Sequence, residues 1–90
     1  MIHVTKVKVK NKMGLHTRPA TAIVKLLQSA KCDVFFTHKQ ETVNAKSILS
    51  LLMLAAKRNS SITITTQGVD AEKTMNSLVS AFENHFGENV

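Results

Sequence analysis

Short stretches in which hydrophobic and polar residues alternate recur along this chain, and each of them predicts a β-strand. In the first, residues 2–9, Val7 and Val9 alternate with lysines, which gives one face for a core and one for solvent. Ile2 and Val4 are out of phase with these valines, so we expect a bulge or a later start of the strand there. Three further strands are predicted at residues 32–37, 42–43 and 61–66.

Between the first two strands, apolar residues recur at the spacing of an amphipathic α-helix. The stripe covers residues 17–28 and consists of Ala20, Ile23, Val24 and Leu27. Pro19 is tolerated only in the first turn of a helix, where its missing N–H group is not needed. The proline therefore predicts that the helix begins at or just after His16.

A second helix is predicted over residues 48–57, with Ser47 as its N-cap. This segment has more apolar residues than one core-facing side requires. The residues that can face the core together are Leu51, Leu54 and Ala55. The residues then left at the surface are Ile48, Leu49 and Leu52. On so small a chain, an exposed apolar group of this kind predicts a contact patch for another protein.

A third helix is expected to begin after Asp70, which we expect to cap it. Its apolar side is marked by Met75, Leu78, Val79, Phe82 and Phe86. The predicted order of elements along the chain is therefore β-α-β-β-α-β-α. This order is typical of an α+β domain in which helices cover one face of an antiparallel sheet. We expect residues 1–90 to form one such domain.

Positive charge is concentrated in the first third of the chain. The formal net charge is +6, and residues 1–32 contain seven Lys and Arg residues but no Asp or Glu. Such asymmetry can indicate binding to nucleic acid, to an anionic membrane surface or to acidic proteins. The chain has four Phe and no Tyr or Trp, and the lysine-rich strand has no aromatic residue for base stacking, so no specific nucleic-acid binding is expected. A solvated face and a surface that attracts acidic partners both remain open.

The apolar segments, the single cysteine and the histidines of the chain narrow the class of protein further. No apolar run approaches the roughly 20 residues that span a bilayer, and the first residues lack the apolar stretch of a signal peptide, so no membrane insertion is expected. The single cysteine, Cys32, excludes an internal disulfide, fits a reducing cytoplasm and is expected to be a small strand residue. The four histidines show no ligand spacing, so we expect no metal site and no cofactor.

The segment of residues 13–20 carries the strongest chemical signal. His16 stands where a helix begins, and the unpaired N–H groups and the dipole of a helix N-terminus favour anions. A neutral imidazole is a competent nucleophile near neutral pH, which makes His16 a candidate phosphoryl acceptor. Arg18 would donate charge-assisted hydrogen bonds to the phosphoryl oxygens. Thr17 would contribute its backbone N–H, and Gly14 would let the loop fold closely around the phosphate.

One alternative to this interpretation follows from the residues alone. A lone histidine beside a helix start is more often a cap or a surface residue than a functional group. The segment around His16 also offers no metal-holding carboxylates, so the phosphoryl donor and the catalytic machinery would come from a partner. We therefore expect a phosphoryl-carrying component rather than a stand-alone enzyme.

Two segments of the chain resemble one known family. Residues 14–20, Gly-Leu-His-Thr-Arg-Pro-Ala, resemble the active-site signature of HPr, the histidine phosphocarrier of the bacterial phosphotransferase system. Residues 43–49, Val-Asn-Ala-Lys-Ser-Ile-Leu, look like the serine segment of the same family. The resemblance implies an open-faced β-sandwich of four antiparallel strands and three helices. It also implies that His16 takes a phosphoryl group on Nδ1 from enzyme I, which phosphoenolpyruvate phosphorylates, and passes it to an enzyme II A domain.

The resemblance extends to regulatory and docking residues. Arg18 matches the phosphate-binding arginine of the family, and Ile48, Leu49 and Leu52 match its hydrophobic docking patch. Ser47 matches the position that an HPr kinase/phosphorylase phosphorylates in many bacteria. A phosphate there would add charge at a helix N-terminus beside the docking patch. The alternative that Ser47 has only a structural role, as an N-cap, remains equally open.

The sequence does not decide which branch of the phosphotransferase system would receive the phosphoryl group. Residues 11–14, 51–54 and 81–86 look more like NPr, the nitrogen-branch relative that phosphorylates a regulatory A-type protein, and Ser50 stands where many sugar-branch members have glycine. A sugar-transport carrier, a nitrogen-branch carrier and a binding module controlled through Ser47 are therefore all retained. A monomer is expected.

Overall fold

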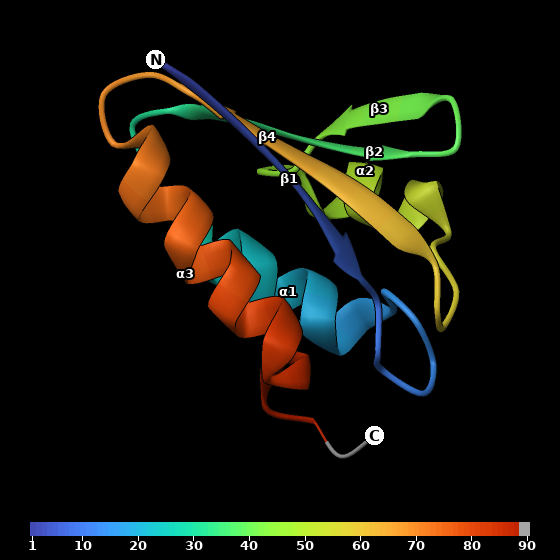
Figure 1. Ribbon diagram of the computed structural model, residues 1–90. Coiled ribbons are helices and arrows are strands. Elements are labelled where there is room, and N and C mark those ends of the chain that lie inside the picture. The colour runs from blue at the N-terminus through green and yellow to red at the C-terminus, as the bar shows by residue number, and fades with distance from the viewer. Residues whose placement is uncertain (89–90) are drawn as a thin grey trace.

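The computed structural model describes residues 1–88, and within them four strands form one antiparallel sheet (Figure 1). Their bounds are Ile2–Lys8 for β1, Asp33–His38 for β2, Glu41–Asn44 for β3 and Ser61–Gln67 for β4. The strand order across the sheet is β1-β4-β2-β3, so the last strand inserts between the first two. The predicted element order and sheet are confirmed.

Three helices cover one face of this sheet and leave the other face open (Figure 1). They are α1 over Thr17–Leu27, α2 over Ile48–Leu54 and α3 over Ala71–Glu83. The α1 helix contacts both α2 and α3, whereas α3 contacts β1 and β4. None of the helices in the described residues combines the length and the apolar character needed to cross a membrane.

The core lies between the helices and the covered face of the sheet. Period-two alternation buries Val34 and Phe36 on β2 and Ile62 and Ile64 on β4. The helical stripes supply the opposite side, with the buried residues Ala20, Ile23 and Leu27 of α1 and Leu78 and Phe82 of α3. Cys32 is 1% exposed and belongs to the same core. These are the positions that the two hydrophobic periods predict.

The β1 strand differs from the prediction at its first residues. Its pairing with β4 is continuous from Ile2, opposite Gln67, to Lys8, opposite Ser61, without a bulge or a later start. The phase set by Val7 continues backwards, so Ile2 and Val4 lie on the open face and are 57% and 62% exposed. The ladder with β4 thus fixes which face each side chain takes, even where the hydrophobic residues are on the wet side.

The α2 helix ends three residues earlier than predicted. Ala55 adopts a left-handed conformation, with φ 53° and ψ 37°, and its N–H donates to the Leu52 carbonyl. As a result Ala55 is exposed, against the prediction, and Ala56 takes the buried position instead, with 4% exposure. The reversal lets the chain after α2 run against the segment that precedes α1.

Asp70 occupies the N-cap position of α3 but does not cap that helix through its side chain. Its carboxylate instead accepts hydrogen bonds from the backbone N–H of Lys31, at 3.0 Å, and of Cys32, at 2.8 Å. The Lys31 N–H, together with hydrogen bonds from Cys32, lowers the pKa of Asp70 to about 2. Asp70 therefore fixes the connection between α1 and β2 to the start of α3.

Phe86 was expected on α3, but α3 ends at Glu83 and a short 3-10 turn follows over His85–Gly87. Phe86 itself has φ 52°, so the chain reverses there rather than continuing the helix. Its ring still packs edge-on against Phe82, with centroids 4.8 Å apart. This contact holds the reversal against the core and directs Glu88 toward the start of α1.

Candidate functional site

His16 is the N-cap residue of α1, with an extended backbone at φ −83° and ψ −166°. Its carbonyl accepts the first helical hydrogen bond, from the Ala20 N–H at 3.1 Å. The imidazole makes no cap hydrogen bond, and the side chain is 27% exposed. The ring is thus held beside the helix terminus without capping it, which argues against the helix-cap interpretation.

The first residues of α1 bring further donors to the same place. The N–H groups of Thr17 and Arg18 precede the first helical hydrogen bond and point out of the helix terminus. The Arg18 side chain is 79% exposed and can swing toward an anion at His16. Pro19 is buried in the first turn, as its missing N–H allows. The predicted phosphate-binding roles of these groups remain predictions.

The loop before His16 is shaped by a close contact with the segment that follows α2. Gly14 has φ +69°, and a Cβ atom at this position would overlap the carbonyl oxygen of Ala56. The next residue, Leu15, donates its N–H to that same carbonyl at 2.9 Å. The Gly14 N–H donates to the Asn11 carbonyl at 3.0 Å, so the contribution of Gly14 here is to the shape of the loop.

A residue that sequence reasoning missed, Glu88, completes the site. Its carboxylate lies 3.2 Å from Nε2 of His16 and 3.6 Å from Nε of Arg18. The fully buried Asn11 donates from Nδ2 to Glu88 at 2.6 Å and to the His85 carbonyl at 2.8 Å. A carboxylate that is 13% exposed therefore links His16 and Arg18 to the core through Asn11.

The surroundings of Glu88 favour its ionised form. Burial acts to raise its pKa, but hydrogen bonds from Asn11 and His16 and the charges of His16 and Arg18 outweigh burial and lower the pKa of Glu88 below its ordinary value. An ionised carboxylate next to Nε2 favours the tautomer in which Nε2 carries the proton. In that tautomer Nδ1 keeps its lone pair, as a nitrogen that accepts a phosphoryl group must.

Replacing Glu88 by glutamine is expected to reduce stability in a pH-dependent way. Because the pKa of Glu88 is lowered by folding, its contribution is present above the pKa of the unfolded chain and is lost as the pH falls through the folded value. We expect Glu88→Gln to lower the free energy of unfolding by about 1 kcal/mol at pH 7. The difference from wild type should shrink as the pH falls below about 4.

Urea unfolding at a series of pH values measures this difference. Glu83→Gln is the matched control, because Glu83 is an exposed carboxylate on α3 that makes no hydrogen bond or ion pair with the described residues. If the free energy of unfolding of Glu88→Gln stays below that of wild type by the same amount down to acid pH, Glu88 has no ionic role.

The α2 helix places the other predicted residues on a neighbouring surface. The Ser47 hydroxyl accepts from the Ser50 N–H at 3.2 Å, so the predicted N-cap is present. The predicted docking residues are exposed: Ile48 by 39%, Leu49 by 65% and Leu52 by 36%. Met53, which sequence reasoning did not single out, is 69% exposed on the same helix. Since α1 and α2 are in contact, this apolar surface adjoins the helix that presents His16.

The chain is similar to known proteins of one family. The family described as PTS HPr component phosphorylation site matches residues 4–84. A phosphocarrier protein HPr of Chlamydia pneumoniae is 44% identical over 80 residues, which cover 89% of this chain and 74% of that protein. Among solved structures, HPr from Thermoanaerobacter tengcongensis matches with a TM-score of 0.93 and 30% identity, covering 98% of this chain and 99% of that one. HPr from Bacillus anthracis matches with a TM-score of 0.83 and 39% identity, covering 88% and 94%.

Proposed function

The chain belongs to the HPr family of phosphocarriers of the phosphotransferase system, and we propose that His16 carries the phosphoryl group from enzyme I to an enzyme II A component. The observation that carries this proposal is the position of His16. Its imidazole stands at the N-terminus of α1, engages no cap hydrogen bond and turns Nε2 toward an ionised carboxylate. Such a ring is free to react at Nδ1.

The transfer step uses each of these groups. Nδ1 of His16 attacks the phosphorus of the phosphorylated donor, so a phosphorus–nitrogen bond forms while the bond from phosphorus to the donor's leaving atom breaks. With the proton already on Nε2, no proton has to leave His16 in this step. The ring gains positive charge as the bond forms, and Glu88, 3.2 Å from Nε2, stabilises that charge.

The phosphoryl oxygens are held by donors from the helix terminus. The N–H groups of Thr17 and Arg18 and the positive end of the α1 dipole favour the transferred group. The guanidinium of Arg18, now 3.6 Å from Glu88, can move to the phosphoryl oxygens because its side chain is largely exposed. Positioning and charge of this kind are most of what phosphoryl transfer requires from a protein.

A transfer assay with phosphoenolpyruvate and enzyme I from the same organism tests the proposal. The wild-type chain should become labelled, and the label should be acid-labile and base-stable, as expected for phosphohistidine and not for phosphoserine. Addition of candidate A components separately then distinguishes a sugar-branch carrier from a nitrogen-branch carrier by which one removes the label. A folded wild-type chain that takes no label would contradict the carrier function.

The exposed apolar residues of α2 are the proposed docking patch for these partners: Ile48, Leu49, Leu52 and Met53. The patch adjoins α1, so a protein seated on it can reach His16. Its apolar side chains would gain from removal of water when a partner binds.

A second candidate function is control through phosphorylation of Ser47. The hydroxyl is partly exposed at the N-terminus of α2, next to Ile48 and Leu49 of the docking patch. A phosphate there would be compatible with the helix N-terminus. It would, however, place a charge of about −1.5 to −2 at the edge of the apolar docking patch. We propose that this modification switches partner binding and leaves the fold intact.

Ser47→Asp is expected to slow phosphoryl exchange with an A component on the order of tenfold, because its charge has to be desolvated beside the docking patch. Aspartate is itself a good N-cap, so stability should change little. Ser47→Ala is the matched control: it removes the cap hydrogen bond, at a cost of about 1 kcal/mol, without adding charge. Equal transfer rates for the two variants, measured with a phosphorylated carrier, would show that charge at Ser47 does not control docking.

A further inference from the structure

A groove runs along the free edge of β1, the strand at one end of the sheet order β1-β4-β2-β3. Its volume is about 400 Å³, and its lining on the β1 side includes the four consecutive residues 5–8. Successive side chains of a strand point to opposite faces, so a hollow that touches all four lies along the edge of β1 and not over one face. The other wall is α3, which packs against β1 (Figure 1).

The backbone of β1 turns hydrogen-bonding groups toward this groove. Val9 donates its N–H to the Ser60 carbonyl at 2.9 Å, and the Met1 carbonyl accepts from the Gly68 N–H at 3.0 Å, both on the side of β4. The direction of the backbone groups alternates along a strand, and the pairing of β1 with β4 is continuous, so the odd-numbered residues of β1 face β4. The N–H and C=O groups of the even-numbered residues, 6 and 8 among them, therefore point to the edge that has no neighbouring strand.

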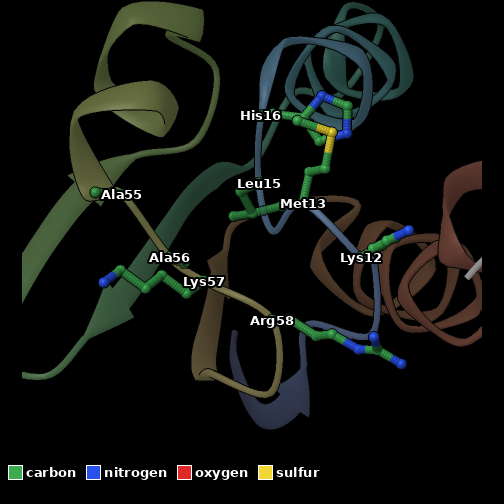
Figure 2. A pocket seen from close by; sticks show the side chains of 8 residues that line it. All are labelled: Lys12, Met13, Leu15, His16, Ala55, Ala56, Lys57 and Arg58. Atoms are coloured by element: carbon green, nitrogen blue, oxygen red, sulfur yellow. The ribbon is translucent and has the colours of Figure 1, made fainter.

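Positive charge prevails in the groove. Its lining holds three exposed lysines from residues 6–10 and one carboxylate, that of Glu83 on α3. Among residues 1–88, no salt bridge involves any of these four groups. Lys12, the next lysine along the chain, belongs to a different pocket, beside His16 (Figure 2). The lysines of the groove are thus available to a negatively charged ligand that lies along β1.

The two sides of the groove differ in polarity. Lys6 and Lys8 project on the open face of the sheet, whereas Val7 is half-buried on the side of α3. Behind Val7 the wall of the groove is apolar, with the half-buried Val79 and the buried Phe82. Side chains of an added strand would alternate in the same way, so acidic ones would lie beside the lysines and apolar ones beside Val7.

We propose that the free edge of β1 binds an extended acidic segment of another protein by strand addition, with acidic and apolar side chains in alternation. Of the two explanations that the sequence leaves open for its lysine-rich strand, this inference selects the acidic partner. A second copy of this chain fits the edge poorly, because pairing would bring three more lysines into the same short ladder. The groove shares no lining residue with the pocket beside His16 or with the docking patch on α2, so the inference does not depend on the carrier function.

A short peptide in which glutamate and valine alternate tests the proposal by titration into the intact chain at roughly 50 mM salt. We expect saturable binding that slows the exchange of the Lys6 and Lys8 amide protons with solvent, because the peptide accepts hydrogen bonds from them. The Thr5 and Val7 amides already face β4 and should keep their exchange rates. Methylation of alternate backbone nitrogens in the peptide should weaken binding about tenfold or more. Placing the glutamates and valines in two separate blocks should do the same.

Variants of the chain separate charge from strand pairing. We expect Lys6→Glu/Lys8→Glu to weaken binding about tenfold or more, and the matched control Lys25→Glu/Lys73→Glu, at exposed helical residues outside the groove, to weaken it less than about threefold. Lys6→Pro and Lys6→Ala lose the same charge, but only proline removes the outward N–H, and an edge strand tolerates proline at such a position. The proline variant should bind the peptide about threefold or more weakly than the alanine variant.

Three results would overturn the proposal: unchanged Lys6 and Lys8 amide exchange at saturating peptide, equal binding of the alternating and block peptides, or equal losses in the two charge-reversed variants. The lysines would then only protect an edge strand from pairing. Slower exchange of the same amides on concentrating the chain alone, without peptide, would assign the edge to a second copy and also overturn it.

Discussion

Replacing His16 by alanine is expected to abolish phosphoryl acceptance from enzyme I while leaving the fold in place. The imidazole makes no cap hydrogen bond, so the start of α1 does not depend on it. Its loss removes one contact with Glu88, for which we expect a change of about 1 kcal/mol in the free energy of unfolding. Nothing else in the first turn of α1 supplies a nucleophilic nitrogen, because the neighbouring groups are hydrogen-bond donors.

Phosphate labelling of the variant beside wild type, with circular dichroism as the check on folding, measures this effect. His38→Ala is the control, since His38 lies at the end of β2 and belongs to a different part of the surface. We expect it to be labelled like wild type. Label on the His16→Ala chain, or loss of label in His38→Ala alone, would assign the acceptor to another residue.

The arrangement of the sheet and helices follows from periodicity that is visible in the sequence. The alternation around Ile62 and Ile64 and the stripe through Ala20, Ile23 and Leu27 place these side chains in the core, where they are found. Such patterns are local, and the burial of one face leaves each element few alternatives. The position of His16 also follows locally, because Pro19 restricts where α1 can begin.

Features that depend on a distant segment were not predictable in this way. Ala55 leaves the helix because the following peptide is hydrogen-bonded to Leu15, a contact between residues about forty positions apart. Asp70 is at the predicted cap position, yet its carboxylate binds the N–H groups of Lys31 and Cys32 instead of its own helix. Local propensity describes what a residue can do, and tertiary neighbours decide which option it takes.

Glu88 shows the same limit within the site. Glu88 reaches His16 only because the chain reverses at Phe86. The left-handed backbone conformation of Phe86 cannot be recognised from the pattern of hydrophobic residues. The buried Asn11 that donates to Glu88 lies 77 residues before it, and no local pattern in the sequence joins the two. A full account of the electrostatics at His16 therefore needed the three-dimensional structure, whereas the histidine itself did not.

Replacing Gly14 by alanine is expected to destabilise the protein by about 2–5 kcal/mol. Two costs add: a left-handed backbone, at φ +69°, is unfavourable for alanine by about 1–2 kcal/mol, and a tightly packed site resists an added methyl group by about 1–3 kcal/mol. The methyl group would overlap the Ala56 carbonyl and lie 3.0 Å from the Lys57 Cα, both of them backbone atoms that cannot move aside easily. Relief of this overlap would separate the loop from the segment after α2 and displace His16.

Gly87→Ala separates the two costs, because Gly87 has φ +79° and no atom within 4 Å of an added Cβ. We expect this control to lose only about 1–2 kcal/mol, which is the backbone cost alone. Urea unfolding gives both values, and phosphoryl acceptance by Gly14→Ala should fall even under conditions where that variant is folded. Equal destabilisation of the two variants would mean that the close approach of Gly14 to Ala56 contributes nothing. In that case the loop that presents His16 would be held by the Leu15 hydrogen bond and not by packing.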